Sequence, residues 1–215
     1  MASLFDTLQA NAFRAGIKAR TRQSRKWFQA NVKNLQVTRP SLLQDKALSR
    51  TSVPIRGNMY MYFYDPKHKD TLPYYDRFPL TVLVDGAPGG FHGLNLHYLP
   101  YNTRAAFLDD LMAFGPPNPK ESSRLTGLRY NLISGVRKFK EFRPCFKHYL
   151  GSNVRSQLAR VPMTDWEIAI FLPVEQFKKS SKQAIWQDSL KQARSPGGIS
   201  IKNTKAYYTR NRKKK

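Results

Sequence analysis

Apolar residues recur every three or four positions in the first part of the chain, which is the spacing of an amphipathic helix. The spacing predicts one helix over residues 3–15 and a second over residues 21–35. Ser3 and Asp6 are placed to form an N-terminal capping box on the first helix. We expect Pro40 to end the second, because the residue before a proline is disfavoured in helical geometry.

The period changes to two after residue 53, which is the alternation of a β-strand. Strands are predicted over residues 58–64, 78–84 and 91–98. Their close succession favours a meander, so we expect a small antiparallel sheet or an SH3-like barrel. A continuous apolar run over residues 166–172 predicts a buried strand that returns to this sheet.

Helical spacing returns after the third strand. It predicts helices over residues 103–114, 122–141 and 145–159, followed by a last amphipathic helix over residues 175–193. The pattern as a whole therefore predicts an α+β fold, in which helices are inserted after the third strand and wrap around the sheet.

These elements divide the chain into three expected parts. Residues 1–50 are expected to form a basic N-terminal helical arm, and residues 51–195 an α+β core domain. Residues 196–215 are expected to form a basic flexible tail, since they open on Pro-Gly-Gly and then carry bases without acids.

Composition adds a strong positive charge to this picture. The 215 residues carry 37 lysines and arginines against 14 acids, a formal net charge of +23. DNA phosphates are the usual partner of such a chain, because binding releases their condensed counterions; an acidic membrane surface is the rival. The basic residues concentrate in residues 1–50, 120–160 and 174–215, whereas residues 51–119 and 161–173 are slightly acidic. This segregation favours a binding footprint.

The candidate DNA contacts are basic residues of these three segments, and they rest on charge alone. They are Arg20, Arg22, Arg25 and Lys26 at the second helix, Arg129, Arg137, Lys138, Lys140, Arg143, Lys147 and Arg155 in the inserted helices, and Arg210, Arg212, Lys213, Lys214 and Lys215 in the tail. Bases at a helix start oppose the helix dipole, which indicates a ligand, although a solvated basic turn explains them equally well. For the tail, a localisation signal or a solubility function is the alternative.

Two groups of aromatic residues have the composition of a stacking surface for unpaired bases. One is interleaved with bases in residues 137–155, and the other consists of Tyr60, Tyr62, Tyr64, Tyr74 and Tyr75. Their helical and cross-strand spacing favours the simpler interpretation, which is that most of these rings belong to the core.

Candidate catalytic groups are few. Cys145, the one cysteine in the chain, stands one predicted helical turn from His148 without a third group to orient the pair, so a structural cysteine is favoured. A single cysteine forms no internal disulfide, which suits a reducing compartment. His92 and His97 fall on opposite faces of a predicted strand, which disfavours a shared metal.

Asp165 and Glu167 are spaced to share a face and, with Asp76 or Asp85, offer ligands for a nuclease-type Mg²⁺ site. A common nuclease pattern has a lysine two residues beyond the acid, but this chain has Ala169 there. No P-loop, dinucleotide-binding or zinc-ligand spacing occurs in the sequence. We therefore expect no enzyme activity and no cofactor.

Four stretches of the sequence carry a resemblance to a known family. They are MYMYFYDPKHKDTLPYYDRFPL (59–80), GFHGLNLHYLP (90–100), FKEFRPCFKHYL (139–150) and DWEIAIFLPVEQF (165–177). Together they resemble the DNA end protector (head-completion) proteins of contractile-tailed bacteriophages. The resemblance implies a virion protein that travels with the packaged genome, binds the ends of the linear duplex and shields them from host exonuclease. It identifies no contact residue.

The leading hypothesis is therefore a protein of the virion, and of the host cytoplasm during assembly and after DNA entry, that protects duplex ends by occupancy. One alternative is a structural head–tail connector or baseplate component that binds other phage head, neck or tail proteins. The second alternative is the Mg²⁺-dependent nuclease. No membrane partner is expected, since no apolar run reaches the roughly 18 residues of a span.

Overall fold

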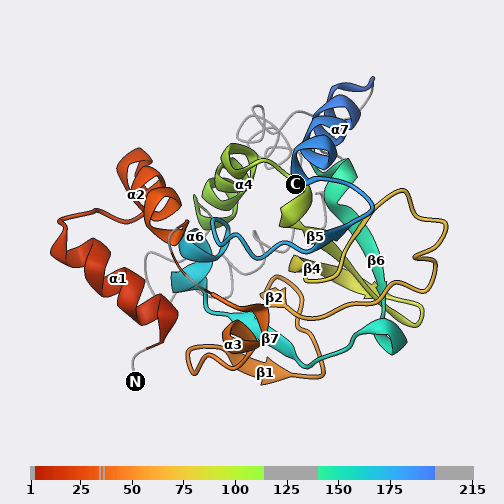
Figure 1. Ribbon diagram of the computed structural model, residues 1–215, viewed down its shortest axis with the longest axis horizontal. Helices are drawn as coiled ribbons and strands as arrows, with labels where there is room; N and C mark the ends of the chain where they lie inside the picture. The colour runs from red at the N-terminus through yellow and green to blue at the C-terminus, as the bar shows by residue number, and fades with distance from the viewer. Residues whose placement is uncertain (1–2, 34, 36, 114–139, 197–215) are drawn as a thin grey trace, which may run out of the picture.

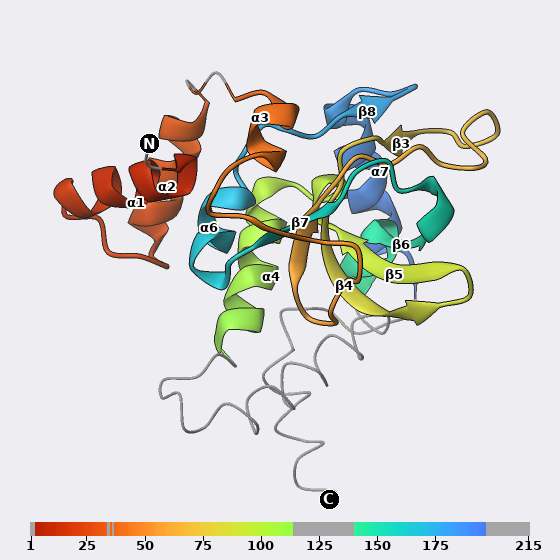
Figure 2. The same cartoon turned by 90° about the horizontal axis from the view of Figure 1, so that it is seen from below.

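The computed structural model describes residues 3–33, 35, 37–113 and 140–196 (Figures 1 and 2). Its centre is a six-stranded antiparallel sheet in the order β1-β7-β2-β4-β5-β6, beside a two-stranded sheet of β3 and β8. The strands are β1 (Ser49–Thr51), β2 (Met59–Met61), β3 (Tyr75–Asp76), β4 (Leu80–Ala87), β5 (Gly90–Asn95), β6 (Phe146–Leu150), β7 (Leu158–Val161) and β8 (Phe177–Lys178). The α+β prediction is confirmed, but the sheet is open and not a barrel, because β1 and β6 are its two edges.

Helices surround this sheet, and α1 and α2 extend to one side as a hairpin (Figure 1). The α-helices are α1 (Leu4–Arg14), α2 (Arg22–Val32), α3 (Arg39–Leu43), α4 (Tyr101–Ala113), α6 (Trp166–Ala169) and α7 (Lys182–Arg194). Short 3₁₀ turns are η1 (Leu96–Tyr98), η4 (Lys140–Cys145), η5 (Gly151–Asn153) and η6 (Met163–Asp165). In the part of the chain that the model describes, no helix combines the length and apolar character of a membrane span.

The two faces of the sheet bury different kinds of side chain. One face carries Met59, Met61, Leu80, Val82 and Leu94, which join a core with side chains of the surrounding helices. The helices contribute Phe5, Phe28, Phe107, Ile168 and Ile185 to this core. Burial of this large apolar surface is the main favourable term that holds the helices to the sheet.

The opposite face of the sheet is aromatic. Tyr60, Tyr62 and Tyr64 are at most 6% exposed, and Tyr62 and Tyr64 meet the ring of Tyr149 edge to face, at centroid distances of 5.6 and 4.9 Å. Edge-to-face packing of this kind is favoured by the ring quadrupoles. These tyrosines therefore belong to the core, as the simpler interpretation predicted, and they are not a stacking platform on the surface.

Two segments have a different structure from the one that the sequence pattern predicted. Residues 145–159 were expected to be helical, but they form β6, η5 and β7. Their apolar positions fit the period of a helix as well as that of a strand. They form strands because β6 pairs with β5, and β7 pairs with β1 and β2. Residues 166–172 were expected to be a strand, but they form α6 and a following turn. A run of residues that is buried on every side is apolar throughout, so its pattern does not distinguish a helix from a strand.

Two smaller boundaries differ as well, and one predicted helix is not tested. Pro40 lies in the first turn of α3, capped by Thr38, so the proline begins a helix and does not end one. The predicted last helix begins only at Lys182, because residues 177–178 pair with β3. The predicted helix over residues 122–141 lies almost wholly outside the described residues.

Gly90 of β5 pairs with Leu150 of β6. A Cβ atom at this position would lie 1.9 Å from the carbonyl oxygen of Tyr149, whereas a Cβ at Gly86 would meet nothing within 4 Å. We predict that Gly90→Ala lowers the free energy of unfolding by about 2 kcal/mol, since the backbone must shift. Gly86→Ala is the matched control and should change it by less than about 0.5 kcal/mol. Urea denaturation of both variants is the measurement, and equal midpoints would contradict the prediction.

Candidate nucleic-acid interface

The N-terminal hairpin, which we define as residues 3–33, is built from local signals. Ser3 and Asp6 form the predicted capping box of α1, and Thr21 and Ser24 form a second box on α2. Each box satisfies backbone N–H groups that the first turn of a helix leaves without partners. The hairpin is therefore defined largely by its own sequence.

The inner face of the hairpin packs on α6. Leu8 and Ala12 of α1 and Phe28 and Val32 of α2 are buried in the same core as Ile168. The hairpin projects away from the sheet in both views (Figures 1 and 2), and the positions of α1 and α2 between these buried residues are mostly exposed. Apolar burial thus fixes which side of each helix faces solvent.

Two buried carboxylates of η6 and α6 hold the hairpin through hydrogen bonds. Glu167 of α6 accepts hydrogen bonds from the backbone N–H of Arg20, at 2.9 Å, and from the Ser24 hydroxyl, at 2.5 Å. The amide of Gln9 donates to Asp165. The acids of residues 161–173 therefore point inward and hold the hairpin, and they leave its outer face without their negative charge.

The nuclease hypothesis needs these carboxylates to meet Asp76 or Asp85. Asp76 lies in a separate buried network, and Asp85 forms an ion pair with Arg56. Among the described residues, no three His, Cys, Asp or Glu side chains come together as a metal site. The two acids of α6 and η6 are thus accounted for as hairpin anchors.

The hairpin carries exposed positive charge. Its exposed bases are Arg14, Lys18, Arg20, Arg22, Lys26 and Lys33. The first turn of α2 contains no acid, so the partial positive charge of the helix N-terminus adds to them. Arg25 differs, because it pairs with Asp109 of α4 and is only partly exposed.

Hydrogen bonds fix the backbone of the loop between α1 and α2. Arg20 has a φ of 62°, which is uncommon for a residue other than glycine. Its N–H bond to Glu167 and the hydrogen bond from the Thr21 hydroxyl to the carbonyl of Lys18 keep the loop in place. Strained backbone of this kind persists only where surrounding contacts impose it.

The other predicted contact residues divide into several places. Lys140 and Arg143 lie on η4, and Arg155 is exposed after η5. Lys147 of β6 has its ammonium 4.2 Å from the ring centroid of Tyr98, and burial lowers the pKa of this lysine. Eight further candidates lie outside the described residues, namely Arg129, Arg137, Lys138, Arg210, Arg212, Lys213, Lys214 and Lys215.

Sequence reasoning missed five exposed bases that join these positions. Arg14, Lys18 and Lys33 extend the basic surface of the hairpin, and Lys191 and Arg194 lie at the end of α7, which packs against η4. The last pair was detectable, because bases in the last turn of a helix complement its dipole. The described structure thus presents bases on the hairpin and at the α7–η4 edge.

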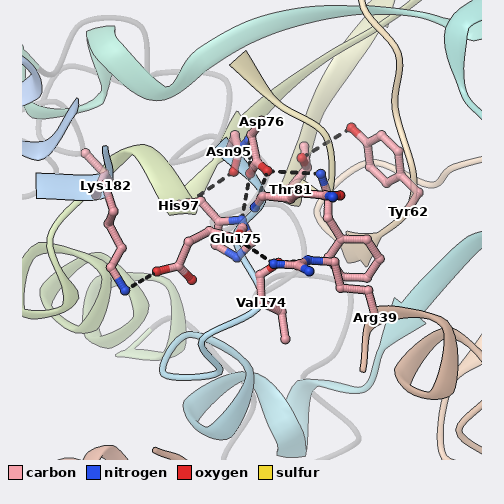
Figure 3. A network of polar contacts seen from close by, with 12 residues as sticks. Arg39, Tyr62, Asp76, Thr81, Asn95, His97, Val174, Glu175 and Lys182 are labelled. Atoms are coloured by element: carbon pink, nitrogen blue, oxygen red, sulfur yellow. Dashed lines mark hydrogen bonds and ion pairs between the residues drawn. The ribbon is translucent and has the colours of Figure 1, made fainter. Parts of the chain in front are cut away.

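A buried polar network at the other side of the molecule has the composition of a catalytic site (Figure 3). His97 Nδ1 lies 2.7 Å from Asp76 Oδ2, and the Asn95 amide donates to the same oxygen at 3.1 Å. Burial alone would raise the pKa of Asp76, but the charge and hydrogen bond of His97 hold it below its usual value. Asp76 is 4% exposed and His97 is fully buried, so the network joins elements and offers no access to a substrate.

The same network fastens the segment between α6 and α7. Lys182 forms a 2.5 Å ion pair with Glu175, and the guanidinium of Arg39 donates to the carbonyls of Val174 and Glu175, at 2.8 and 2.9 Å (Figure 3). Burial alone would raise the pKa of Glu175, but the positive charges of His97, Arg104 and Lys182 outweigh it and lower the pKa. These contacts are structural.

Cys145 and His148 do not form a nucleophile and base. Cys145 is buried on η4 with its thiol directed at the carbonyl of Phe142, whereas His148 is exposed on β6. Burial raises the pKa of the thiol, which disfavours the reactive thiolate. The prediction that Cys145 and His148 lie one helical turn apart fails, because Cys145 ends η4 and His148 lies in the strand β6.

Asp165 makes stability depend on pH. Burial raises its pKa to about 6, so the folded protein binds a proton that the unfolded chain, with a pKa near 4, releases. Stability should therefore rise as the pH falls from about 7 to about 4. We predict that Asp165→Asn raises the free energy of unfolding at pH 7 by roughly 1 kcal/mol, a value reduced for solvent screening.

The measurement is urea denaturation of wild type and Asp165→Asn at several pH values between about 4 and 7. The two curves should converge toward pH 4, because the Asp165 carboxyl of the folded protein is protonated there and no charge is buried. A constant difference across this range would contradict the assignment of the pH dependence to Asp165.

Comparison with known families gives one match that covers most of the chain. The family model described as phage T4 terminal DNA protecting protein matches residues 2–191. No curated protein and no solved structure gives a significant match. The matched range includes the hairpin, the whole sheet and most of α7.

Proposed function

Since this chain belongs to the phage T4 terminal DNA protecting protein family, we propose that it binds the ends of packaged linear duplex DNA and protects them from host exonuclease. The protein would act in the virion and, after DNA entry, in the host cytoplasm. Bulk placed on the terminus denies a nuclease its starting point, and this requires no bond to be made or broken.

The observation that carries the proposal is the division of charge across the N-terminal hairpin. Its two anchoring acids, Asp165 and Glu167, are buried beneath it, while its bases face outward. Residues 3–33 carry seven bases and one acid, Asp6, and a surface with such an excess of positive charge attracts a polyanion. Lys and Arg side chains there would neutralise backbone phosphates without reading sequence.

The test is digestion of linear duplex DNA by a processive exonuclease with and without the protein. Saturating wild type should leave the DNA intact, and equal digestion with and without protein would remove the proposal. Circular DNA is the binding control, because it offers the same phosphates and no terminus. A symmetric ring of protein at the head–tail junction in virions, without protection of DNA, would favour the connector alternative.

The hairpin is tested by a triple variant, Arg20→Ala, Arg22→Ala and Lys26→Ala. Each lost phosphate contact should reduce the slope of log affinity against log salt by about 0.9, so we expect a slope smaller by roughly 2–3. The matched control removes three exposed bases elsewhere, Lys46, Lys67 and Lys178. If the slope falls equally in both triple variants, binding depends on the net charge of the protein and not on the surface of the hairpin.

A further inference from the structure

A pocket of about 500 Å³ opens between α1, the α1–α2 loop, α2 and the η6–α6 turn. Its walls are mainly apolar, and they include Ala12, Ile17, Phe28, Met163 and Ile168. The volume is in the range of pockets that hold small organic ligands. The pocket lies within the basic hairpin, where it adds a second property to the positive charge.

One of the residues that line the pocket, Phe13, has an exposed aromatic ring. Phe13 is 85% exposed, the highest value among the large hydrophobic side chains that the model describes. The buried stripe of α1 consists of Phe5, Leu8 and Ala12, so packing of the helix does not require an aromatic residue at the next position. A single exposed phenylalanine is ordinary, but one beside an apolar pocket forms a stacking surface.

Positive charges stand at the mouth of the same pocket. Lys18 and Arg20 line it and are exposed, and neither forms an ion pair with another described residue. The acid in the pocket wall, Glu167, is 7% exposed and already accepts two hydrogen bonds from the hairpin. An anion is therefore favoured at the mouth and an uncharged planar group inside.

A nucleotide combines these two requirements. We propose that the pocket receives the terminal nucleotide of a DNA strand, unstacked from the duplex end, with its base against Phe13 and its phosphate at Lys18 and Arg20. Proteins that take a base out of the stack hold it between apolar and aromatic side chains, and each such stack gives a sequence-tolerant gain in affinity. This inference rests on the proposed function, and it gives a way to distinguish an end from the interior of a duplex.

The test compares duplexes with open ends and duplexes of the same length whose ends are closed by covalent hairpins. Wild type should bind open ends more tightly, because a closed end releases no terminal nucleotide. Phe13→Ala should weaken binding to open ends by about 5- to 150-fold and leave binding to closed ends unchanged. Val53→Ala, at a side chain 73% exposed elsewhere on the surface, is the matched control and should change neither.

Phe13→Trp supplies the second readout. A tryptophan keeps the stacking surface, so this variant should retain the preference for open ends, and its added fluorescence should be quenched by open-ended DNA alone. If Phe13→Ala binds open ends as tightly as wild type does, while wild type still protects DNA from exonuclease, the pocket assignment is overturned and the proposed function stands. No protection by wild type would remove the proposed function itself.

A free nucleotide is the other source of the same chemistry. Deoxyadenosine monophosphate should compete poorly with open-ended DNA, since it lacks the phosphates that the rest of the basic surface contacts. Tight binding of the mononucleotide alone, lost in Phe13→Ala, would overturn the assignment to a DNA terminus.

Discussion

Replacement of Asp76 by alanine should lower the free energy of unfolding by about 3–5 kcal/mol, the range for a buried ion pair that loses one partner. Four groups depend on this carboxylate. The backbone N–H groups of Phe78 and Gln176 donate to Oδ1, each at 3.0 Å, while Asn95 and His97 contact Oδ2. Alanine leaves all four buried without this acceptor.

The loss should extend beyond β3, because the carboxylate joins this strand to residues 95–97 and to residue 176. Thermal denaturation is the measurement, and the melting temperature should fall by roughly 2–4 °C for each kcal/mol in a chain of this size. Asp70→Ala, at an exposed loop position, is the matched control and should change stability by less than about 0.5 kcal/mol.

The effect should also depend on pH in a defined direction. Interaction with His97 leaves the pKa of Asp76 below its usual value, so its contribution is present above the unfolded pKa near 4 and is lost as the pH falls through the folded pKa. The difference between wild type and Asp76→Ala should therefore shrink in acid. A loss below about 1 kcal/mol at pH 7 would mean that the network does not hold the fold together.

Replacement of Glu167 by alanine should release the N-terminal hairpin and leave the sheet intact. The carboxylate is the acceptor for the Arg20 N–H and the Ser24 hydroxyl, and hydrogen bonds to a charged group are worth about 1.5–3 kcal/mol each. We expect a loss of about 3 kcal/mol, concentrated in local opening of the hairpin.

Limited digestion with trypsin measures this opening, because Lys18, Arg20 and Arg22 lie in or beside the α1–α2 loop. Glu167→Ala should be cut there faster than wild type, and hydrogen exchange should rise in α2 and not in β4 or β5. Asp109→Ala removes an acid that contacts the hairpin through an exposed ion pair, and it is the matched control. Its partner Arg25 and the acid itself are 29% and 48% exposed, so this ion pair should contribute at most about 1 kcal/mol. Equal cleavage of the two variants would contradict the anchoring role of Glu167.

The elements that the sequence predicted well are those with local causes. α1 and α2 carry an apolar stripe and polar caps within their own residues, so pattern and structure agree. The segments that it predicted wrongly take their form from distant partners. β6 and β7 are strands because β5 and β2 lie alongside them, and nothing within residues 145–159 specifies this.

The candidate site divides in the same way. Charge alone identified Arg20, Arg22 and Lys26, which are exposed on the hairpin. Charge did not reveal the function of Asp165 and Glu167, because two acids two residues apart are typical of a metal site as well as of an anchor. Their contacts with residues more than 140 positions earlier in the chain distinguish the two.

The strand order has a consequence for biosynthesis. β1 and β2 are close in sequence, yet β7, made about a hundred residues later, lies between them and pairs with both. Until the ribosome has made residue 161, both neighbours present unpaired edges, which are sites of aggregation. Docking of the hairpin also waits for Glu167. Nascent chains that stop before β7 should therefore depend on chaperones. Only completed chains should fold and become able to bind DNA.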